Sequence, residues 1–465
     1  DVLGSRGLGD VYKRQGCNSL DSIAFPDSLA YLDNRIFANC EKLRIVNMGK
    51  GVNSIHSYNN VFENCPNIEK VYFSPKLTTI PALFNGKTNL TTVILGDSVK
   101  TIGGSAFAGC AQLSSINIPN TATTIEDYAF NGCAGLKDIK LPDSLRALGA
   151  YSFIGAGLES ITIPNKLKTL RERTFASCPN LKTVVLGDSL ESIVADYSAT
   201  FYETPNITTV KFGKGMKEIN NAFGGQANLT TVVLGDSITV IGNSAFNGCT
   251  ALKSINIPNT ARTIGDYAFA GCAALTNITL PDSLQTLGGY AFSGAGLTNI
   301  TIPNKVKELR ERTFASCPNL TTVVLGDSLK TIVSDYSGAF RDTPNITSVT
   351  FGDGIEEINS AFSGQAKLTK VILGKKVKTI GNNAFSGCTS LASFSFPETI
   401  TNLGTSAFNG AGLRTLTLPS KLTQIPEMAF YNCDSLRSII LGKQITQIAN
   451  NAFGECDSIR EVTVD

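Results

Sequence analysis

Phenylalanine recurs along this chain at nearly equal intervals, and this repetition constrains the fold more than any other feature. Nineteen phenylalanines follow one another, mostly 22 or 23 residues apart. A fixed period of this length is typical of solenoids, in which each unit is too small to bury a core alone. The repeats are marked by Phe37, Phe62, Phe84, Phe107, Phe130, Phe153, Phe175, Phe201, Phe223, Phe246, Phe269, Phe292, Phe314, Phe340, Phe362, Phe385, Phe408, Phe430 and Phe453.

One repeat shows the local structure that the period predicts. From Ala245 the chain reads AFNGCTALKSINIPNTARTIG, in which Ile255 and Ile257 are two residues apart and share one face of a short strand. Pro258 has no amide hydrogen and ends the strand. The stretch 264–269 is too short for a free-standing helix, and we expect a single helical or 3-10 turn there. Stacked in parallel, such units form a solenoid that buries the Phe, Cys, Leu and Ile side chains of each rung.

The apolar skeleton of the repeat identifies a family resemblance. The phrase A-F-x-x-C-x-x-L-x-x-I-x-I/L-P-x-S-L-x-x-I-G resembles the BspA-like, or Treponema-pallidum-type, leucine-rich repeats of bacteria, over about residues 16–465. The resemblance implies an α/β-type leucine-rich-repeat solenoid, right-handed and curved, with one short parallel strand per repeat and helical or 3-10 turns on the convex side. It also implies a cell-surface or secreted protein of a host-associated bacterium that adheres to host matrix proteins or to other cells.

A longer period of 139 residues lies on top of the short one. Phe107, Phe246 and Phe385 are each 139 residues apart, so that six unequal repeats recur as a block. The phrase RERTFASCPNL at 171–181 returns letter for letter at 310–320. This near-identity indicates tandem duplication, and it makes the recurrence of an exposed residue at this spacing weak evidence of function.

The two periods predict the domain organisation. Residues 16–465 are expected to form a single continuous solenoid of about 19 repeats with the 139-residue super-repeat. Residues 1–15 fit no repeat and have no apolar core of a secretory signal, so we interpret them as artefactual or disordered. Both ends lack a capping repeat, and we expect the chain to be an internal fragment of a longer protein.

Composition excludes several classes of function. Lys and Arg number 40 against 38 Asp and Glu, a net charge of +2, so no basic surface for nucleic acid is indicated. The single histidine, His56, leaves little for a His-centred triad or a multi-His metal site. No apolar run of about 18 residues predicts a membrane span. We expect a monomer without catalytic residues, cofactor or metal, whose ligand is a protein.

The twelve cysteines allow three interpretations, namely metal ligands, disulfides or buried thiols. Eleven stand three residues after a repeat phenylalanine, and no C-x-x-C occurs, so zinc and thioredoxin-like motifs have no support. Equivalent side chains of stacked rungs point the same way and lie near the rung spacing of about 4.8 Å, beyond the roughly 3.8 Å between Cβ atoms that a disulfide prefers. We predict a ladder of buried free thiols, nearly all of which titrate as free after denaturation.

Two polar positions also recur beside the strands. Seven N-x-S/T sequons begin the approach to a strand, and Asp follows the strand in L-G-D-S or L-P-D-S. We interpret both as turn residues whose side chains hydrogen-bond the backbone nearby. Glycosylation of the asparagines and calcium binding by the aspartates are the alternatives.

Two surfaces are candidates for ligand binding. One is the exposed face of the strands, for which a solvated β-face is the alternative. The other is the longer, 26-residue repeat, which reads IVADYSATFYETPNI at 193–207 and IVSDYSGAFRDTPNI at 332–346. Insertions in a solenoid map to loops on one face, often the binding face, and a tolerated duplicated bulge is the alternative. The strand-face candidates are Asn117, Lys140, Thr162, Val185, Lys211, Val233, Asn256 and Thr279, and the candidate contact residues in insertions are Asp196, Tyr197, Asp335, Tyr336, His56 and Tyr58.

Three classes of function remain open for such a chain. The first is a non-enzymatic adhesion or ligand-binding protein, extracellular or at the cell surface, in which weak equivalent contacts add through multivalency. The second is a structural or self-associating surface array. The third is the recognition arm of a larger multidomain enzyme, whose catalytic domain would lie outside these residues. We expect the first.

Overall fold

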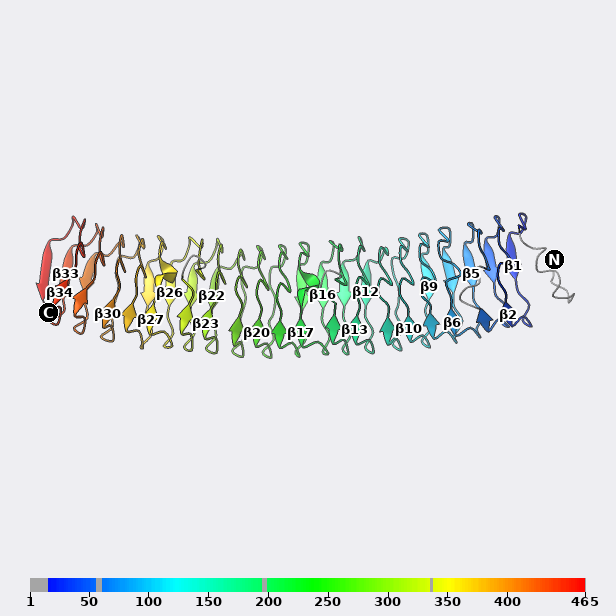
Figure 1. Ribbon diagram of the computed structural model, residues 1–465, viewed down its shortest axis with the longest axis horizontal. Coiled ribbons are helices and arrows are strands. Elements are labelled where there is room, and N and C mark those ends of the chain that lie inside the picture. Colours follow the sequence, from blue (N-terminus) through cyan, green and yellow to red (C-terminus); the bar gives the residue numbers. More distant parts are fainter. Residues whose placement is uncertain (1–15, 56–60, 195–198, 335–337, 465) are drawn as a thin grey trace. The chain divides into compact units, whose positions relative to one another are not determined.

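The described part of the molecule comprises four segments of chain. The computed structural model describes residues 16–55, 61–194, 199–334 and 338–464. The expected non-repeat segment 1–15 lies outside them. The four segments consist of short rungs, each one sequence repeat long, which are joined to their neighbours by parallel strands, so that the predicted solenoid is confirmed (Figure 1).

The chain divides into two compact units. Unit 1 comprises Asp1–Lys217 and Val232–Ser237, and unit 2 comprises Glu218–Thr231 and Ile238–Asp465. The expectation of one continuous solenoid over 16–465 stays a prediction.

Strands of three or four residues form the first of two ladders in each unit. Ile23 of β1 (Ser22–Ala24) lies opposite Val46 of β3 (Ile45–Asn47), and both side chains are buried between exposed or half-buried neighbours. This alternation is the one that Ile255 and Ile257 predict, since successive strand residues face opposite sides. In unit 1 the ladder also contains β5 (Lys70–Tyr72), β7 (Thr92–Ile94), β9 (Ser115–Asn117), β12 (Ser160–Thr162), β14 (Thr183–Val185) and β16 (Thr209–Lys211). In unit 2 it contains β22 (Asn299–Thr301), β24 (Thr322–Val324), β26 (Ser348–Thr350), β28 (Lys370–Ile372), β31 (Thr415–Thr417), β33 (Ser438–Leu441) and β35 (Glu461–Val464), while β18 (Thr231–Val233) has residues of both units.

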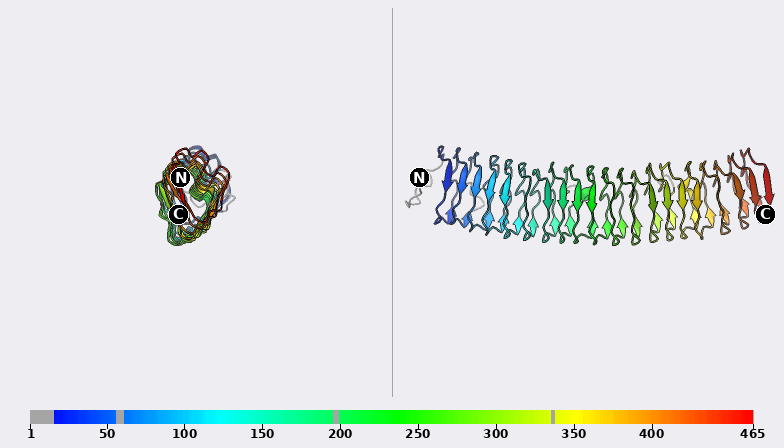
Figure 2. Two further views of the ribbon diagram at one scale, coloured as in Figure 1. Left: turned by 90° about the vertical axis from the view of Figure 1, so that its left-hand side faces the viewer. Right: turned by 180° about the vertical axis from the view of Figure 1, so that it is seen from behind.

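A second ladder of two-residue strands runs beside the first, so the expectation of one strand per repeat is wrong in this detail (Figure 2). Most of these strands pair a polar residue with a buried aliphatic one, and two residues are too few to produce a periodic signal. In unit 1 these strands are β2 (Tyr31–Leu32), β4 (Ser54–Ile55), β6 (Thr79–Ile80), β8 (Thr101–Ile102), β10 (Thr124–Ile125), β11 (Ala147–Leu148), β13 (Thr169–Leu170) and β15 (Ser192–Ile193). In unit 2 they are β17 (Glu218–Ile219), β19 (Val240–Ile241), β20 (Thr263–Ile264), β21 (Thr286–Leu287), β23 (Glu308–Leu309), β25 (Thr331–Ile332), β27 (Glu357–Ile358), β29 (Thr379–Ile380), β30 (Asn402–Leu403), β32 (Gln424–Ile425) and β34 (Gln447–Ile448).

The segments around the phenylalanines are turns, so the helical turn expected at 264–269 is also wrong. Ile264 belongs to β20, and Tyr267 and Gly271, on either side of Phe269, have φ of 57° and 70°. A helix requires negative φ at every residue, and these two left-handed residues prevent it. Among the described residues, 3-10 turns occur only at η2 (Asn221–Phe223) and η3 (Ser360–Phe362). None of the described helices is long and apolar enough to cross a membrane.

The repeat phenylalanines stack on one another in the core of each unit. In unit 2, the Phe269 ring lies 5.6 Å from that of Phe246 and 5.3 Å from that of Phe292, with nearly parallel planes. All three side chains are fully buried. One phenylalanine per rung therefore produces long aromatic stacks, such as the one from Phe246 to Phe362 in unit 2, because parallel rungs place equivalent side chains next to each other.

The cysteines are free thiols that hydrogen-bond the backbone of this stack. All twelve are free and ten are buried, as predicted. The Sγ of Cys272 donates to the carbonyl of Phe246 at 3.3 Å, one rung back. In two of the rungs without cysteine, the hydroxyls of Thr204 and Thr343 donate to the carbonyls of Phe175 and Phe314 at 2.8 Å. Other rungs have Ala, Gln or Lys at this position, so a small hydrogen-bond donor is frequent there but not required.

This role predicts how substitutions at Cys272 affect stability. Threonine retains a donor for the Phe246 carbonyl, whereas valine has the same shape without one. We expect Cys272→Val to be less stable than Cys272→Thr by about 1 kcal/mol, the usual worth of a single hydrogen bond. Urea unfolding of the two variants measures the difference, and equal stabilities would show that the thiol is only a space-filling group.

Candidate functional site

A series of tyrosine and arginine side chains lies on the turns before the buried phenylalanines. Two residues before the phenylalanine, four successive rungs carry Ser, Tyr, Tyr and Arg, and the same series occurs once in each unit. We call each series a tyrosine ladder. The ladders are Ser105, Tyr128, Tyr151 and Arg173 in unit 1, and Ser244, Tyr267, Tyr290 and Arg312 in unit 2.

Backbone hydrogen bonds hold the residues of a ladder in register. The N–H of Ser105 donates to the carbonyl of Asp127 at 3.0 Å, and the N–H of Tyr128 donates to that of Ala150 at 3.1 Å. Each donor has left-handed φ, 56° and 60° respectively. This conformation costs about 1–2 kcal/mol per non-glycine residue, and the hydrogen bonds between rungs offset it. Because each ladder residue has the same backbone conformation, their side chains leave the turns at intervals of one rung.

The two tyrosines of each ladder stack face to face. The ring centroids of Tyr128 and Tyr151 are 4.8 Å apart with planes 9° from parallel, and those of Tyr267 and Tyr290 are 4.6 Å apart at 13°. Tyr128 is 41% and Tyr267 42% exposed, which is high for a ring that already has an aromatic partner. Exposed tyrosine and arginine side chains are the residues that contribute most to protein interfaces.

An arginine stands one rung beyond each tyrosine pair, and its ring partner differs between the units. In unit 2, the guanidinium of Arg312 lies 5.8 Å from the Tyr290 centroid. In unit 1, Arg173 instead lies 4.7 Å from the ring of Tyr202, whose place in unit 2 is taken by Arg341. Both are cation–π contacts, in which a positive group is attracted by the face of the ring.

A hollow of 690 Å³ adjoins the tyrosine ladder of unit 1. Its charged walls are formed by Glu126, Asp127, Arg146, Lys168 and Arg171, and Gly149 lies among its lining residues. A Cβ on Gly149 would clash with the backbone of Glu126 and Asp127, so a side chain there is sterically excluded.

Hydrogen bonds hold the acids of this hollow in place. Glu126 Oε2 accepts the N–H of Gly104 at 2.8 Å, and Asp127 Oδ1 accepts that of Ala150 at 2.9 Å. Arg171 Nη1 lies 3.4 Å from the same Asp127 oxygen. Both carboxylates therefore retain further acceptor capacity beside Tyr128, because an ionised carboxylate has about four lone-pair sites.

Unit 2 repeats this arrangement with fewer charges. Asp266 Oδ1 accepts the N–H of Gly289 at 2.8 Å and lies 3.8 Å from Arg310 Nη1. A glycine, Gly265, stands where unit 1 has Glu126, and Gln285 stands where unit 1 has Arg146. The two ladders thus share their aromatic stack and differ in the charges beside it.

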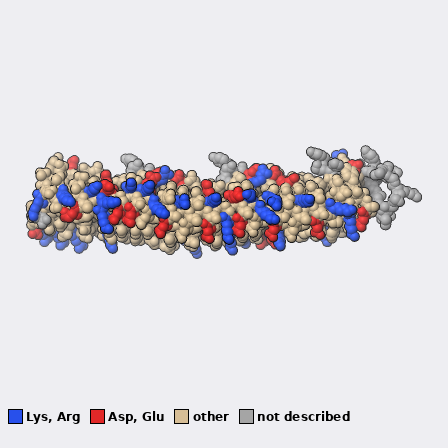
Figure 3. Space-filling model, turned by 90° about the horizontal axis from the view of Figure 1, so that it is seen from below, with Lys and Arg blue, Asp and Glu red and all other residues tan. Residues whose placement is uncertain are grey.

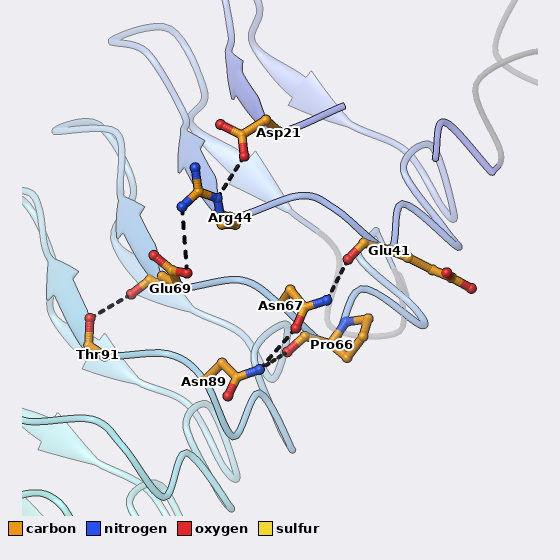
Figure 4. Close-up of polar contacts among 8 residues, drawn as sticks. All are labelled: Asp21, Glu41, Arg44, Pro66, Asn67, Glu69, Asn89 and Thr91. Atoms are coloured by element: carbon orange, nitrogen blue, oxygen red, sulfur yellow. Dashed lines mark hydrogen bonds and ion pairs between the residues drawn. The ribbon is translucent and has the colours of Figure 1, made fainter. Parts of the chain in front are cut away.

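Other polar groups form ladders that connect rungs. In unit 1, Arg44 Nε contacts Asp21 Oδ1 at 2.6 Å, and Arg44 Nη1 lies 3.9 Å from Glu69 Oε1 (Figure 4). The hydrogen bond from Arg44 lowers the pKa of Asp21. These groups are exposed, so the ion pairs add little stability. On the face shown in Figure 3, Lys and Arg lie among Asp and Glu, and neither sign forms a continuous patch.

The recurrent asparagines and aspartates are turn residues, as expected. Nδ2 of Asn206 donates to the Pro179 carbonyl at 2.7 Å, and that of Asn345 donates to the Pro318 carbonyl at 2.6 Å. Oδ1 of Asp188 accepts the N–H of Lys214, one rung on, at 3.2 Å. Within the described residues, no group of three or more His, Cys, Asp or Glu side chains could hold a metal ion.

The contact residues predicted in the insertions lie outside the described residues. They are Asp196, Tyr197, Asp335, Tyr336, His56 and Tyr58. The bases of two insertions are described: Thr200 N–H donates to the Val194 carbonyl at 3.0 Å, and Ala339 N–H donates to that of Val333 at 2.9 Å. In unit 2, a hollow of 540 Å³ is lined by Ser334 and Gly338, which flank 335–337 in sequence.

The strand-face residues lie where the alternation places them. All eight are exposed except Val185, which is half-buried. Two apolar residues that the sequence-based selection omitted also lie on this face, since Tyr72 pairs with Ile94 in register and they are 40% and 42% exposed. This face therefore has more apolar surface than expected in unit 1.

Sequence reasoning missed the tyrosine ladders. A signal was present, because tyrosine stands two residues before the phenylalanine in two consecutive repeats, at Tyr128 and Tyr151, and again at Tyr267 and Tyr290. The sequence predicts a helical turn at this position. That prediction gives no reason to expect contact between tyrosines one repeat apart. Only the extended stacking of rungs places these rings in contact.

The sequence matches one family over nearly its whole length. The family model described as "BspA type Leucine rich repeat region (6 copies)" matches residues 12–114, 100–230, 239–363 and 357–465. Among curated proteins, no relative matches.

Several solved structures are similar to this chain. One is a leucine-rich repeat protein from Bacteroides ovatus, with 26% identity, 85% of this chain and 86% of that chain covered, and a TM-score of 0.40. Another is a leucine-rich repeat protein from Eubacterium ventriosum, with 24% identity, coverage of 75% and 84%, and a TM-score of 0.32. A leucine rich cell surface protein from Faecalibacterium prausnitzii has 20% identity, coverage of 96% and 88%, and a TM-score of 0.23.

Proposed function

The chain belongs to the BspA-type leucine-rich-repeat family, and we propose that it binds a protein partner through its two tyrosine ladders. Leucine-rich repeats of this type are generally non-enzymatic scaffolds for protein–protein interaction. The observation that carries the proposal is the stacked tyrosine pair of each unit, with ring separations of 4.8 Å in unit 1 and 4.6 Å in unit 2 and one exposed ring in each pair, Tyr128 and Tyr267. Two equivalent contacts on one chain increase the affinity for a repetitive partner through multivalency.

The ladders support binding better than the other exposed positions do. Each combines two tyrosines with an arginine, whereas the eight predicted strand-face residues are Asn, Lys, Thr and Val. Tyrosine provides a large, rigid contact area at a low cost in conformational entropy. In more specific terms, we propose that the protein adheres to host matrix or to other cells. We also propose that it is located at the cell surface or outside the cell.

Replacing one tyrosine in each ladder tests the proposal. We expect full-length protein to bind saturably to at least one of immobilised fibronectin, fibrinogen, laminin or collagen, and the double variant Tyr128→Ala/Tyr267→Ala to bind at least about tenfold more weakly, as loss of an aromatic hot spot at both sites implies. Surface plasmon resonance measures both. Tyr31→Ala is the matched control, because Tyr31 is exposed to the same degree, 42%, but lies outside the ladders.

Two outcomes would contradict this function. One is the absence of saturable binding to any of the four proteins, and the other is binding that the double variant leaves unchanged. The insertions provide a comparison, since we also propose that they contribute contacts. If Tyr197→Ala/Tyr336→Ala weakens binding while the ladder variant does not, the partner is held by the insertions.

A further inference from the structure

Each tyrosine stack has one open end. In the ladder of unit 1, Tyr128 stacks on Tyr151 on one side, and Ser105 occupies the equivalent position one rung away on the other. In unit 2, Ser244 has the same relation to Tyr267, because its N–H donates to the Asp266 carbonyl at 2.8 Å. Serine is too small to cover a ring. Within the described residues, the outer faces of Tyr128 and Tyr267 therefore have no aromatic or cationic partner.

In unit 1 the open end carries a carboxylate. Glu126 Oε2 reaches back one rung to accept the N–H of Gly104, which is next to Ser105 in the chain. Asp127 reaches the other way, to the N–H of Ala150 and to Arg171, and Asp266 of unit 2 likewise reaches forward to the N–H of Gly289 and to Arg310. A positive charge over the open face of Tyr128 would thus be attracted by the ring and by Glu126, and one over Tyr267 by the ring alone.

The closed end shows which group the stack accepts. In unit 2, the guanidinium of Arg312 lies over the face of Tyr290, 5.8 Å from its centroid. Arg312 and Tyr290 stand at equivalent positions of neighbouring rungs, so a guanidinium can occupy the place one rung beyond a ring. The open end of unit 1 offers an equivalent ring face over Ser105, with Glu126 nearby.

We propose that the outer faces of Tyr128 and Tyr267 each bind an arginine side chain of the partner protein, over Ser105 and Ser244. This inference rests on the proposed function and names the chemistry of the partner. The guanidinium stacks on the ring, and in unit 1 the carboxylate of Glu126 accepts its hydrogen bonds. The arginine should bind more tightly at Tyr128 than at Tyr267, since unit 2 has Gly265 where unit 1 has Glu126.

The test uses small probes and the full chain, with its tyrosine rings labelled with 13C. N-acetyl-argininamide should shift the ring signals of Tyr128 and Tyr267 saturably at millimolar concentration, and more tightly at Tyr128. N-acetyl-citrullinamide, which has the same shape without the charge, should cause no saturable shift. The double variant Ser105→Tyr/Ser244→Tyr extends the stacks and should abolish the effect of argininamide.

Charge is tested by variants that keep the fold. Asp127→Asn retains the acceptor for Ala150, as Asn382 does for the N–H of Thr405 at 2.8 Å. Glu126→Gln likewise retains the acceptor for Gly104. The combined variant should bind argininamide at least about fivefold more weakly at Tyr128 and leave Tyr267 unchanged, since removing nearby opposite charges weakens a cation's binding.

Three results would overturn the inference. Argininamide could fail to shift either tyrosine, citrullinamide could bind equally well, or N-acetyl-phenylalaninamide or methyl glucoside could bind in its place. The proposed function is separable from these results. If Tyr128→Ala/Tyr267→Ala abolishes binding to the matrix protein while the serine and carboxylate variants do not, the ladders bind a partner by another chemistry.

Discussion

Phe269→Ala is expected to destabilise unit 2 by about 3–5 kcal/mol, because it removes a fully buried ring and leaves a cavity. The ring is 0% exposed and stacks on Phe246 and Phe292 at 5.6 and 5.3 Å. In a solenoid each rung is stabilised by its neighbours alone, so the loss interrupts the stack on both sides. Urea unfolding followed by circular dichroism should show an earlier transition for the variant than for the unmodified chain.

A neighbouring residue provides the control. Tyr267 stands two residues before Phe269 in the same turn and is 42% exposed, so Tyr267→Ala should cost less than about 1 kcal/mol. Both variants remove an aromatic ring that stacks on a neighbour, and they differ in burial. Similar losses for the two would mean that ring stacking, and not burial, stabilises the rungs.

Unfolding at alkaline pH is the second large effect that we expect. Burial raises the pKa of the Cys249, Cys317 and Cys388 thiols from 9.0 to about 12. Burial also raises the pKa of Cys272, and the neighbouring thiol of Cys456 together with burial raises that of Cys433. Between pH 9 and 12 the unfolded chain therefore ionises thiols that the folded chain keeps protonated.

The sign of the effect follows from these pKa values. A group whose pKa is raised by folding contributes its full stability below the unfolded pKa of 9 and loses it as the pH rises towards 12. In this range each such thiol lowers the free energy of unfolding by about 1.4 kcal/mol per pH unit. With five of them in unit 2, the urea midpoint should fall steeply above pH 9.5.

Substitution of the thiols isolates their contribution. In the test variant, the five cysteines of unit 2 with raised pKa values are changed to threonine. This variant should lose stability much more gradually over the same pH range. The ionisation of tyrosines is then the main remaining cause of the loss. The measurement is urea unfolding under reductant at several pH values, with a count of thiols in the denatured chain, for which we expect nearly all twelve. Parallel pH curves for the two proteins would contradict a thiol origin.

Some of this architecture could be predicted from residue spacing alone. The 22–23-residue period of phenylalanine predicts a stack of rungs, and the alternation of Ile255 and Ile257 predicts which strand residues are buried, at 6% and 5% exposure. The position of cysteine three residues after phenylalanine predicts buried free thiols. These inferences succeed because in a solenoid a residue's neighbour in space is its equivalent one repeat away.

Other features depend on backbone conformation, which spacing does not encode. The left-handed φ of Tyr267 and Gly271 replaces the expected helical turn by an open one, and the two-residue strand β20 is too short for periodicity to reveal. The region of 254–257 alternates as a strand should, yet it does not form a regular strand. The reason is that hydrogen bonds between rungs, which decide these details, join residues a full repeat apart.

The sequence by itself determined the repeat, the residues of the core and the free state of the thiols, because these depend on one side-chain type recurring at one interval. Only the tertiary structure decided which exposed residues act together. Tyr128 and Tyr151 are 23 positions apart in the chain, and their rings are 4.8 Å apart once the rungs are stacked. The open ring face over Ser105 exists for the same reason: a parallel stack places each turn residue against its equivalent in the next rung, and a small residue there leaves a face uncovered.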